Sequence, residues 1–376
     1  MASTPLDLLW PVSIALCVFL VLTGHVTVES GLVRAKHSVN AAAKALVQIG
    51  LTTLAVWAAG FGIMNAGGPL AGAGPFAPAD GGSELVLALV VACAATTLLS
   101  GPVAERTTLR AHAVFVCVFS LAVFPFVVHW AWAQGDTPGW LRALGFVDLA
   151  GAGVIHVAGG AAALAAALVV GPRTGRFGGA RRVLIVQSQS FPFAALGVML
   201  LWLGWFGLAI SQAMAAGLAL APVIINLVLA GAGAITAAFV ANQVRPARVT
   251  VVHIIQAAIA GVVAASAGPH LLHPLGAVAL GIGGALAAFA GARLLDLMEI
   301  DDALGLAPAH LFAGALGVLA VAACEPATLP ATLAVQVSGL LAILSWSAAV
   351  MAGAAIALRA VMRLRVSAED ERIGLN

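Results

Sequence analysis

Two histidines in separate apolar segments are the residues best placed to do chemistry in this chain. His156 lies in the apolar stretch 146–170, which carries Asp148 near its start, and His310 lies in a later apolar segment. Ionisable groups are costly inside a membrane span and by default mark a site or pathway. A neutral imidazole donates a hydrogen bond at one nitrogen and accepts one at the other, so two of them provide polar steps without fixed charge.

The composition of the chain indicates a membrane protein. Of its 376 residues, 62% are hydrophobic and 9% are charged. Soluble domains carry about 25% charged residues, so this chain has too few to cover a surface that faces water. The formal net charge is +2, and the basic residues are scattered rather than clustered, which does not favour nucleic acid as a partner.

Metal, cofactor and enzyme motifs are absent from the sequence. The four cysteines lie in apolar segments without CxxC spacing, which is typical of buried thiols rather than of metal ligands or disulfides. They are Cys17, Cys93, Cys117 and Cys324. There is no HExxH, no GxSxG and no facing carboxylate pair. We therefore expect neither an enzyme nor a bound cofactor or metal.

Eleven apolar runs are long enough to cross a bilayer, which takes about 20 residues as a helix. The first run lacks the basic start of a signal peptide, so we expect it to remain as a helix. The runs are 8–28, 44–64, 84–101, 111–132, 147–170, 184–209, 217–240, 250–267, 274–295, 306–324 and 331–358.

The basic residues predict the orientation. With eleven spans, 16 of the 17 lysines and arginines fall on one side, and Arg142 is alone on the other. Cytoplasmic loops carry such an excess, so we expect the N-terminus outside and the C-terminus in the cytoplasm. The 16 are Arg34, Lys36, Lys44, Arg106, Arg110, Arg173, Arg176, Arg181, Arg182, Arg245, Arg248, Arg293, Arg359, Arg363, Arg365 and Arg372.

The two histidines occupy matching places in the predicted order of spans. His156 lies in the fifth span and His310 in the tenth, so each would belong to one half of five helices. An odd number of spans inverts the second half relative to the first, which is a common transporter plan. The sequence thus predicts an all-α integral membrane protein with eleven transmembrane helices: two five-helix inverted repeats plus a terminal helix. The membrane domain would cover 1–362, and 363–376 would be a cytoplasmic tail.

An ordered set of motifs resembles the ammonium transporter (Amt/Mep/Rh) family. The motifs run from the first span to the end of the chain with spacing similar to that of the family. They are 29–36 (ESGLVRAK), 101–106 (GPVAER), 129–132 (HWAW), 148–151 (DLAG) with His156, 204–207 (GWFG), 301–302 (DD) before His310, and the tail 364–375.

The resemblance implies a homotrimer in the cell membrane (plasma or inner), with one narrow, mostly apolar pore in each subunit. His156 and His310 would be the paired imidazoles at mid-pore. Asp148 would be the buried acid near an outer recruitment site for ammonium, and Trp205 would line the lower pore. Trp132 would offer its ring face to the cation, a contact that contributes about 2 kcal/mol when desolvated. The tail would respond to a PII-type regulatory protein.

Three positions depart from the family pattern. Many members stack two phenylalanines over the pore, and the corresponding positions here are Val91 and Leu208. A small polar residue of the outer site would fall at Gln212, with Ser211 beside it. The outer site is thus expected to be rebuilt.

The resemblance implies transport: ammonium is recruited outside, deprotonated and passed as ammonia through the apolar pore. An ammonium ion cannot cross such a pore cheaply, because losing its water costs several kcal/mol. The alternative is an Amt-like sensor or receptor with little flux. Loss of the gate phenylalanines favours the sensor, whereas the presence of both His156 and His310 favours transport.

Structural roles remain open for several polar residues. Asp148 can equally cap the start of its helix by accepting hydrogen bonds from backbone amides. Asp301 and Asp302 can cap the tenth span in the same way. Glu29 and Glu105 are better explained as ties between loops than as ligands.

Three further histidines have an alternative structural interpretation. A single histidine in a membrane helix is often a hydrogen-bond donor between helices. This applies to His25, His129 and His253.

Overall fold

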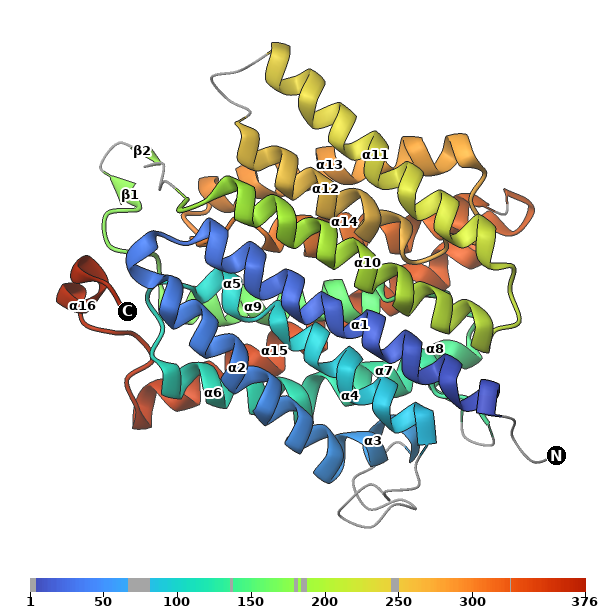
Figure 1. Ribbon diagram of the computed structural model, residues 1–376, viewed down its shortest axis with the longest axis horizontal. Coiled ribbons are helices and arrows are strands. Elements are labelled where there is room, and N and C mark those ends of the chain that lie inside the picture. Colours follow the sequence, from blue (N-terminus) through green and yellow to red (C-terminus); the bar gives the residue numbers. More distant parts are fainter. Residues whose placement is uncertain are drawn as a thin grey trace.

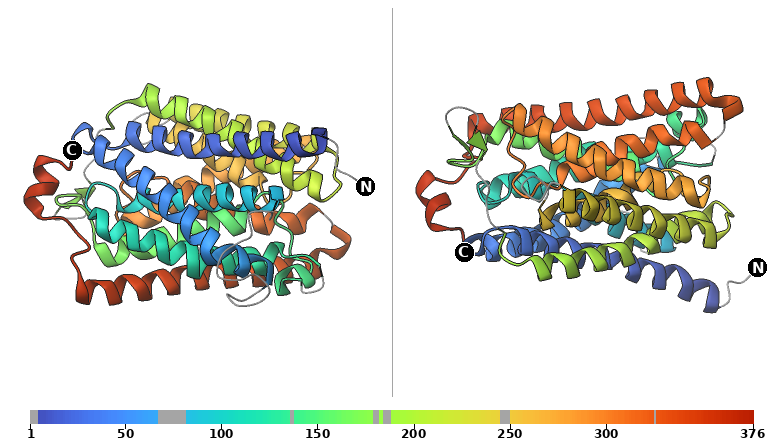
Figure 2. Two further views of the ribbon diagram at one scale, coloured as in Figure 1. Left: turned by 60° about the horizontal axis from the view of Figure 1, so that its bottom comes forward. Right: turned by 90° about the horizontal axis from the view of Figure 1, so that it is seen from above.

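The computed structural model is a bundle of helices that run roughly along one long axis (Figures 1 and 2). It describes residues 5–66, 82–135, 138–178, 182–183, 188–244, 250–324 and 326–376. Arg181, Arg245 and Arg248, which belong to the predicted basic pattern, lie outside the described residues.

The first half of the chain forms the helices up to α9. They are α1 (Pro5–Leu32), η1 (Ala35–His37), α2 (Ser38–Ala55), η2 (Val56–Gly60), α3 (Phe61–Ala66), α4 (Gly82–Thr97), α5 (Ser100–Val103), α6 (Leu109–Val118), η3 (Phe119–Val123), α7 (Phe124–Trp132), α8 (Trp140–Ala143), η4 (Ala152–Val157) and α9 (Ala158–Val170). The π-helical segments η2, η3 and η4 continue directly into α3, α7 and α9, so each such run is one long helix.

The second half begins with a small hairpin and continues with long helices. The elements are β1 (Phe177–Gly178), β2 (Arg182–Val183), α10 (Phe191–Ala215), α11 (Leu220–Val244), α12 (Val251–Ala265), α13 (Pro274–Leu297), α14 (Ala307–Ala320), η6 (Val321–Cys324), η7 (Pro326–Thr328), α15 (Leu329–Val361) and α16 (Ala368–Ile373).

Ten helical segments of the described chain are long and apolar enough to cross a membrane. The eighth predicted span, 250–267, corresponds to α12, an apolar helix of 15 residues that is not among these ten. At 1.5 Å per residue it is about 23 Å long, less than the ~30 Å of a bilayer core. The structure therefore confirms a helical protein of many spans, whereas the count of eleven stays a prediction.

Large apolar side chains cover the outside of the bundle. Leu16, Met199 and Val361 are 67%, 67% and 79% exposed. In water such a surface would promote association, but it suits contact with lipid. The exposure pattern thus supports the membrane class that the composition predicts.

Helices α1 and α10 lie side by side along most of their length (Figure 1). Glycines allow this close approach: a Cβ added at Gly24 would lie 2.6 Å from the backbone nitrogen of Leu201. A Cβ at Gly197 would lie 2.6 Å from the nitrogen of Val28. Small residues at such contacts are typical of membrane helices.

Two predicted spans begin well before the observed helix. The sixth span was expected from residue 184, but α10 begins at Phe191, where the Ser190 side chain accepts a hydrogen bond from the Phe193 amide. The fifth span was expected from residue 147, but helix begins at Ala152. The described residues just before each helix, 188–190 and 147–151, have non-helical backbone, which periodicity cannot distinguish from helix.

Buried ion pairs join the loops at the end of the bundle where α16 lies, called here the tail end. Arg173 binds Asp301 with two nitrogens, at 2.8 and 2.9 Å, and binds Glu105 at 3.0 Å. Arg34 also binds Glu105, at 2.8 Å, and Arg106 donates to the backbone oxygen of Asp301 at 2.7 Å. Glu105 is thus a tie between loops, in agreement with its structural interpretation.

Candidate functional site

His156 and His310 form a buried pair near the middle of the bundle. Their Nδ1 atoms lie 3.0 Å apart and the ring centroids 5.0 Å apart, with 17° between the ring planes. The two side chains are 3% and 4% exposed. The hydrogen bond requires that one Nδ1 carries a hydrogen and the other does not. If both rings are neutral, one Nε2 is an acceptor and the other a donor.

The Nε2 atoms of this pair are free of partners. Both are buried, and neither makes a hydrogen bond with any residue that the structure describes. Buried polar atoms normally have a partner, so unpaired ones point to a functional role. The pair therefore offers one acceptor and one donor to a small molecule beside it.

Asp148 holds the start of the helix that carries His156. Its carboxylate accepts hydrogen bonds from the amides of Gly151, Gly153 and Val154, at 3.1, 2.9 and 2.8 Å. Gly151 adopts φ +86°, a conformation that favours glycine, and this turn directs the chain into η4. The acid thus acts here as a helix cap.

Asp302 plays the same part for the helix that carries His310. Its carboxylate accepts from the Ala307 amide at 2.7 Å and from the Leu304 amide at 3.3 Å. Burial outweighs these hydrogen bonds and raises the pKa of Asp302 to about 6. The neighbouring Asp301 faces the arginines of the tail end instead.

The Trp205 ring of α10 packs against His156. The ring centroids are 4.3 Å apart, and the indole Nε1 donates to the Ser266 hydroxyl at 2.8 Å. That hydroxyl donates in turn to the Val262 carbonyl of α12, at 2.7 Å. Three elements thus fix the position of the Trp205 ring beside the pair.

A third imidazole lies beside the pair. His25 of α1 is stacked on His310 with the ring centroids 5.8 Å apart. A cavity of about 30 Å³ is lined by His25, His156, His310 and Trp205, together with apolar side chains. The sequence alone does not assign His25 to the site, because nothing local distinguishes it from a structural histidine.

Larger cavities open at the end of the bundle opposite α16. One of about 590 Å³ and one of about 410 Å³ are both lined by Trp132 and Gln212. Val91 lines the first and Asp148 the second. Together they are called here the vestibule.

Two of the predicted vestibule residues do not line these cavities. Ser211 is partly buried on α10 and lines neither of them. Leu208 is fully buried at 0% exposure. Both predicted gate positions are buried in the core, but Val91, 5% exposed, also lines the first cavity, whereas Leu208 lines neither.

A cavity of about 320 Å³ lies at the tail end. It is lined in part by Asp302 and Pro308, at the start of α14, and by Gln256 and His253 of α12. Open space is thus present on both sides of the histidine pair along the axis of the bundle.

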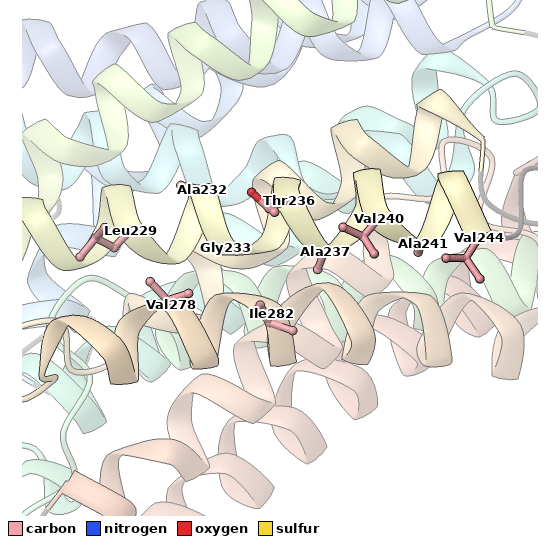
Figure 3. A pocket seen from close by; sticks show the side chains of 10 residues that line it. All are labelled: Leu229, Ala232, Gly233, Thr236, Ala237, Val240, Ala241, Val244, Val278 and Ile282. Carbon is pink, nitrogen blue, oxygen red and sulfur yellow. The ribbon is translucent and has the colours of Figure 1, made fainter.

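A groove on the surface of the bundle is unrelated to the histidines. It holds about 710 Å³ between α11 and α13 (Figure 3). Its side chains are apolar except for Thr236, and none of them titrates. We assign the site to the histidine pair, because the groove offers no group for chemistry.

The other singled-out residues have structural partners. The Nδ1 atom of His129 is 3.1 Å from the Met64 carbonyl, which links α7 to α3. His253 accepts from the Thr250 amide at 3.0 Å and so caps its own helix. Glu29 accepts a hydrogen bond from the Ser100 hydroxyl.

A helical membrane bundle with a buried histidine pair between two open ends is the architecture of a transport or channel protein. The profile of the Ammonium Transporter Family matches residues 9–376. The chain belongs to this family, whose members are transporters and not enzymes.

Two named relatives agree with this assignment. The chain is 33% identical to a putative ammonium transporter of Synechocystis sp., over 99% of this chain and 73% of the relative. It is 30% identical to the ammonium transporter Amt2 of Archaeoglobus fulgidus, over 99% and 86%.

Solved structures share the fold. A protein described as a sensor Amt protein superposes with a TM-score of 0.91 at 30% identity, covering 98% of this chain and 96% of that one. Candida albicans Mep2 superposes with a TM-score of 0.80 at 21% identity, covering 98% and 86%. The second likeness concerns the fold alone.

Proposed function

We propose that this protein transports ammonium across a membrane by deprotonating it and passing ammonia through an apolar pore centred on His156 and His310. The single observation that carries this proposal is the Nδ1–Nδ1 hydrogen bond, with both Nε2 atoms left unpaired. An apolar path rejects the ion because its desolvation costs several kcal/mol, whereas ammonia crosses it.

The pair can also move a proton. The bare Nε2 of one ring takes a proton from ammonium, leaving ammonia. The hydrogen on that ring's Nδ1 passes across the 3.0 Å bond to the Nδ1 of the other ring, which then releases the hydrogen of its own Nε2. One proton enters, one leaves, and the two tautomers are exchanged. Transport by this route is electrogenic.

Recruitment is proposed at the vestibule, where Trp132 and Gln212 line both cavities. The Trp132 ring supplies a cation–π face, worth about 2 kcal/mol when desolvated. Asp148 supports the recruitment site indirectly, because its carboxylate already accepts hydrogen bonds from three backbone amides. The support for Ser211 as a recruitment residue is weaker, because it lines neither cavity. Trp205 lines the pore beside the histidine pair.

The membrane placement is part of the same proposal. We infer eleven spans in two inverted halves plus a terminal helix, as a domain over 1–362 with a tail at 363–376. The packing of α1 on α10, and of η4 on α14, supports matched halves, since these are the first and fifth spans of each. We place the tail end in the cytoplasm of a plasma or inner membrane, because basic residues gather there.

A homotrimer and a PII-type partner at the tail are proposed on the family resemblance. Support for a structured tail is local: Glu371 accepts from Arg365 at 2.7 Å and from the Thr174 amide at 2.7 Å. A tail held in one place offers a defined surface to a partner.

The second candidate is an ammonium sensor with little flux. It is favoured by the likeness to the sensor Amt protein and by Val91 and Leu208 at the two gate positions. Such a protein would bind ammonium at the vestibule and couple binding to a partner.

Proteoliposomes distinguish the two candidates. Ammonium-driven current is measured for the parent protein and for the His156→Ala, His310→Ala double variant, and ammonium binding is measured in detergent. A current in the parent that the double variant loses or alters supports transport. Binding without any current in the parent contradicts transport and leaves the sensor.

A further inference from the structure

The position of His25 sets it apart from the other histidines of the described chain. Its ring stacks on His310 with 28° between the planes, and its side chain is 8% exposed. It comes from α1, whereas His156 lies in η4 and His310 in α14. Three elements thus bring three imidazoles to one place.

No structural hydrogen bond explains this histidine. The ring nitrogens of His25 make none with any residue that the structure describes, whereas His129 and His253 each have a backbone partner. A buried polar group without a partner is costly. An apolar residue would fill the position at lower cost if packing were its only task.

The cavity beside His25 fits one small molecule. Its volume of about 30 Å³ exceeds the roughly 10–15 Å³ that a single water molecule needs. Ammonia is of similar size. An occupant of this cavity lies against the wall and can take hydrogen bonds from it.

The imidazoles are the groups left to supply those bonds. The indole nitrogens of Trp202 and Trp205 also face this region, but they donate to the Ala258 carbonyl at 3.1 Å and to the Ser266 hydroxyl at 2.8 Å. The other lining side chains are apolar: Val21, Leu201, Ile259, Val262 and Val263.

We propose that His25 is a third binding residue of the histidine centre, which hydrogen-bonds a single ammonia molecule in the cavity that it shares with His156 and His310. This rests on the proposed function and deepens it. A neutral imidazole serves ammonia in either sense, by donating to the lone pair or by accepting one N–H. The molecule that leaves the pair thus finds a polar partner in an otherwise apolar wall.

The test compares two replacements of His25. His25→Leu removes the hydrogen-bonding group, and His25→Gln keeps one without the imidazole. His273→Asn is the matched control, because His273 is an exposed cap of α13 that accepts from the Leu275 amide. Ammonium and methylammonium fluxes are measured in proteoliposomes, and ammonium binding is measured by the thermal shift in detergent.

We expect His25→Leu to lower ammonium flux and binding roughly 5–30-fold, the effect of one lost hydrogen bond to a desolvated ligand. His25→Gln should stay within about threefold of the parent, and His273→Asn should match it. The ratio of methylammonium to ammonium flux should rise in His25→Leu, because the larger methylated ligand fits less well beside His25 in this small cavity and so loses less when the imidazole is removed. If His25 were only structural, its replacement would not change this ratio of fluxes.

Unchanged flux, binding and ratio in His25→Leu would overturn the proposal while leaving the transport function intact. If the parent protein carries no flux, the proposal of transport is wrong. The effect of His25→Leu on ammonium binding then tests the proposed role of His25. If His25→Leu does not elute as the parent does in gel filtration, His25→Met replaces it, since methionine is apolar and adapts to irregular space.

Discussion

The indole Nε1 of Trp132 donates to the backbone carbonyl of Asp148 at 2.6 Å. This bond joins the vestibule to the turn that starts the His156 helix, since the carboxylate of the same aspartate accepts from the amides of that turn. A substitution at either residue should therefore shift the position of the other, and hence that of the histidine pair.

Removal of the Asp148 carboxylate should loosen this connection. Asp148→Ala leaves three buried amides unpaired, and loss of a helix cap costs about 1–2 kcal/mol. We expect a lower unfolding temperature in detergent and lower ammonium flux, with Asp148→Asn intermediate. Glu369→Ala, on the exposed tail, is the control. A variant as stable as the parent but without flux would show that the charge of Asp148, rather than its capping, supports transport.

Replacement of one histidine of the pair should destabilise the protein by more than the loss of the side-chain atoms alone. In His310→Ala the Nδ1 of His156 loses its partner in a buried site, which costs about 1–3 kcal/mol. We expect this loss in a thermal unfolding assay, together with loss of the ammonium-driven current. Full stability in the single variant would mean that the 3.0 Å hydrogen bond contributes nothing.

The two gate positions should respond differently to phenylalanine. Val91 faces a cavity of about 590 Å³, so Val91→Phe has room and adds a second aromatic face to the vestibule. An added cation–π contact of about 1 kcal/mol corresponds to roughly fivefold tighter ammonium binding.

Leu208 is fully buried, so Leu208→Phe should overpack the core and cost about 1–3 kcal/mol. Ammonium titrations and unfolding curves of the two single variants check both outcomes. Equal behaviour of the variants contradicts the different environments of these positions.

Asp301 should make stability depend on pH in the acid range. Burial favours its protonated form, but the hydrogen bonds and charge of Arg173, with the charge of Arg106, prevail and lower the pKa of Asp301 to about 2. A lowered pKa stabilises the folded state above the unfolded value, near 3.9, and this contribution is lost as the pH falls toward 2.

The corresponding contribution is about 2 kcal/mol at neutral pH. Asp301→Asn should therefore unfold at a lower temperature than the parent at pH 7, and the difference should shrink between pH 5 and pH 3. A difference that stays constant with pH would assign the effect to lost hydrogen bonds alone.

The docked tail should depend on Glu371. This side chain is buried and binds Arg365 and Thr174, whereas Glu369 is exposed and binds only Arg372 among the described residues. Glu371→Ala should free α16 and speed trypsin cleavage at Arg372, while Glu369→Ala is the matched control. Flux should fall in Glu371→Ala if the tail acts on transport. Equal cleavage rates for the two variants would show that Glu371 does not hold the tail.

Local pattern was enough to predict the membrane class, most spans and the ionisable residues within them. Apolar length and scarce charge leave few alternatives to a helical membrane protein. His156 and His310 stood out because imidazoles are rare and costly in such segments. The two capping aspartates were also open to prediction, since an acid just before a helix satisfies backbone amides that are only a few residues away.

Long-range contact decided the rest. His156 and His310 are 154 residues apart, and His25 comes from yet another helix. Whether a histidine faces a cavity or a carbonyl depends on which helix face packs on which neighbour. For α1 that choice follows from Gly24 and Gly197, which let it lie directly against α10. Val91 and Leu208 likewise look alike in the sequence, and both are buried. Only Val91 borders a cavity, because the space beside a side chain depends on how the surrounding helices pack.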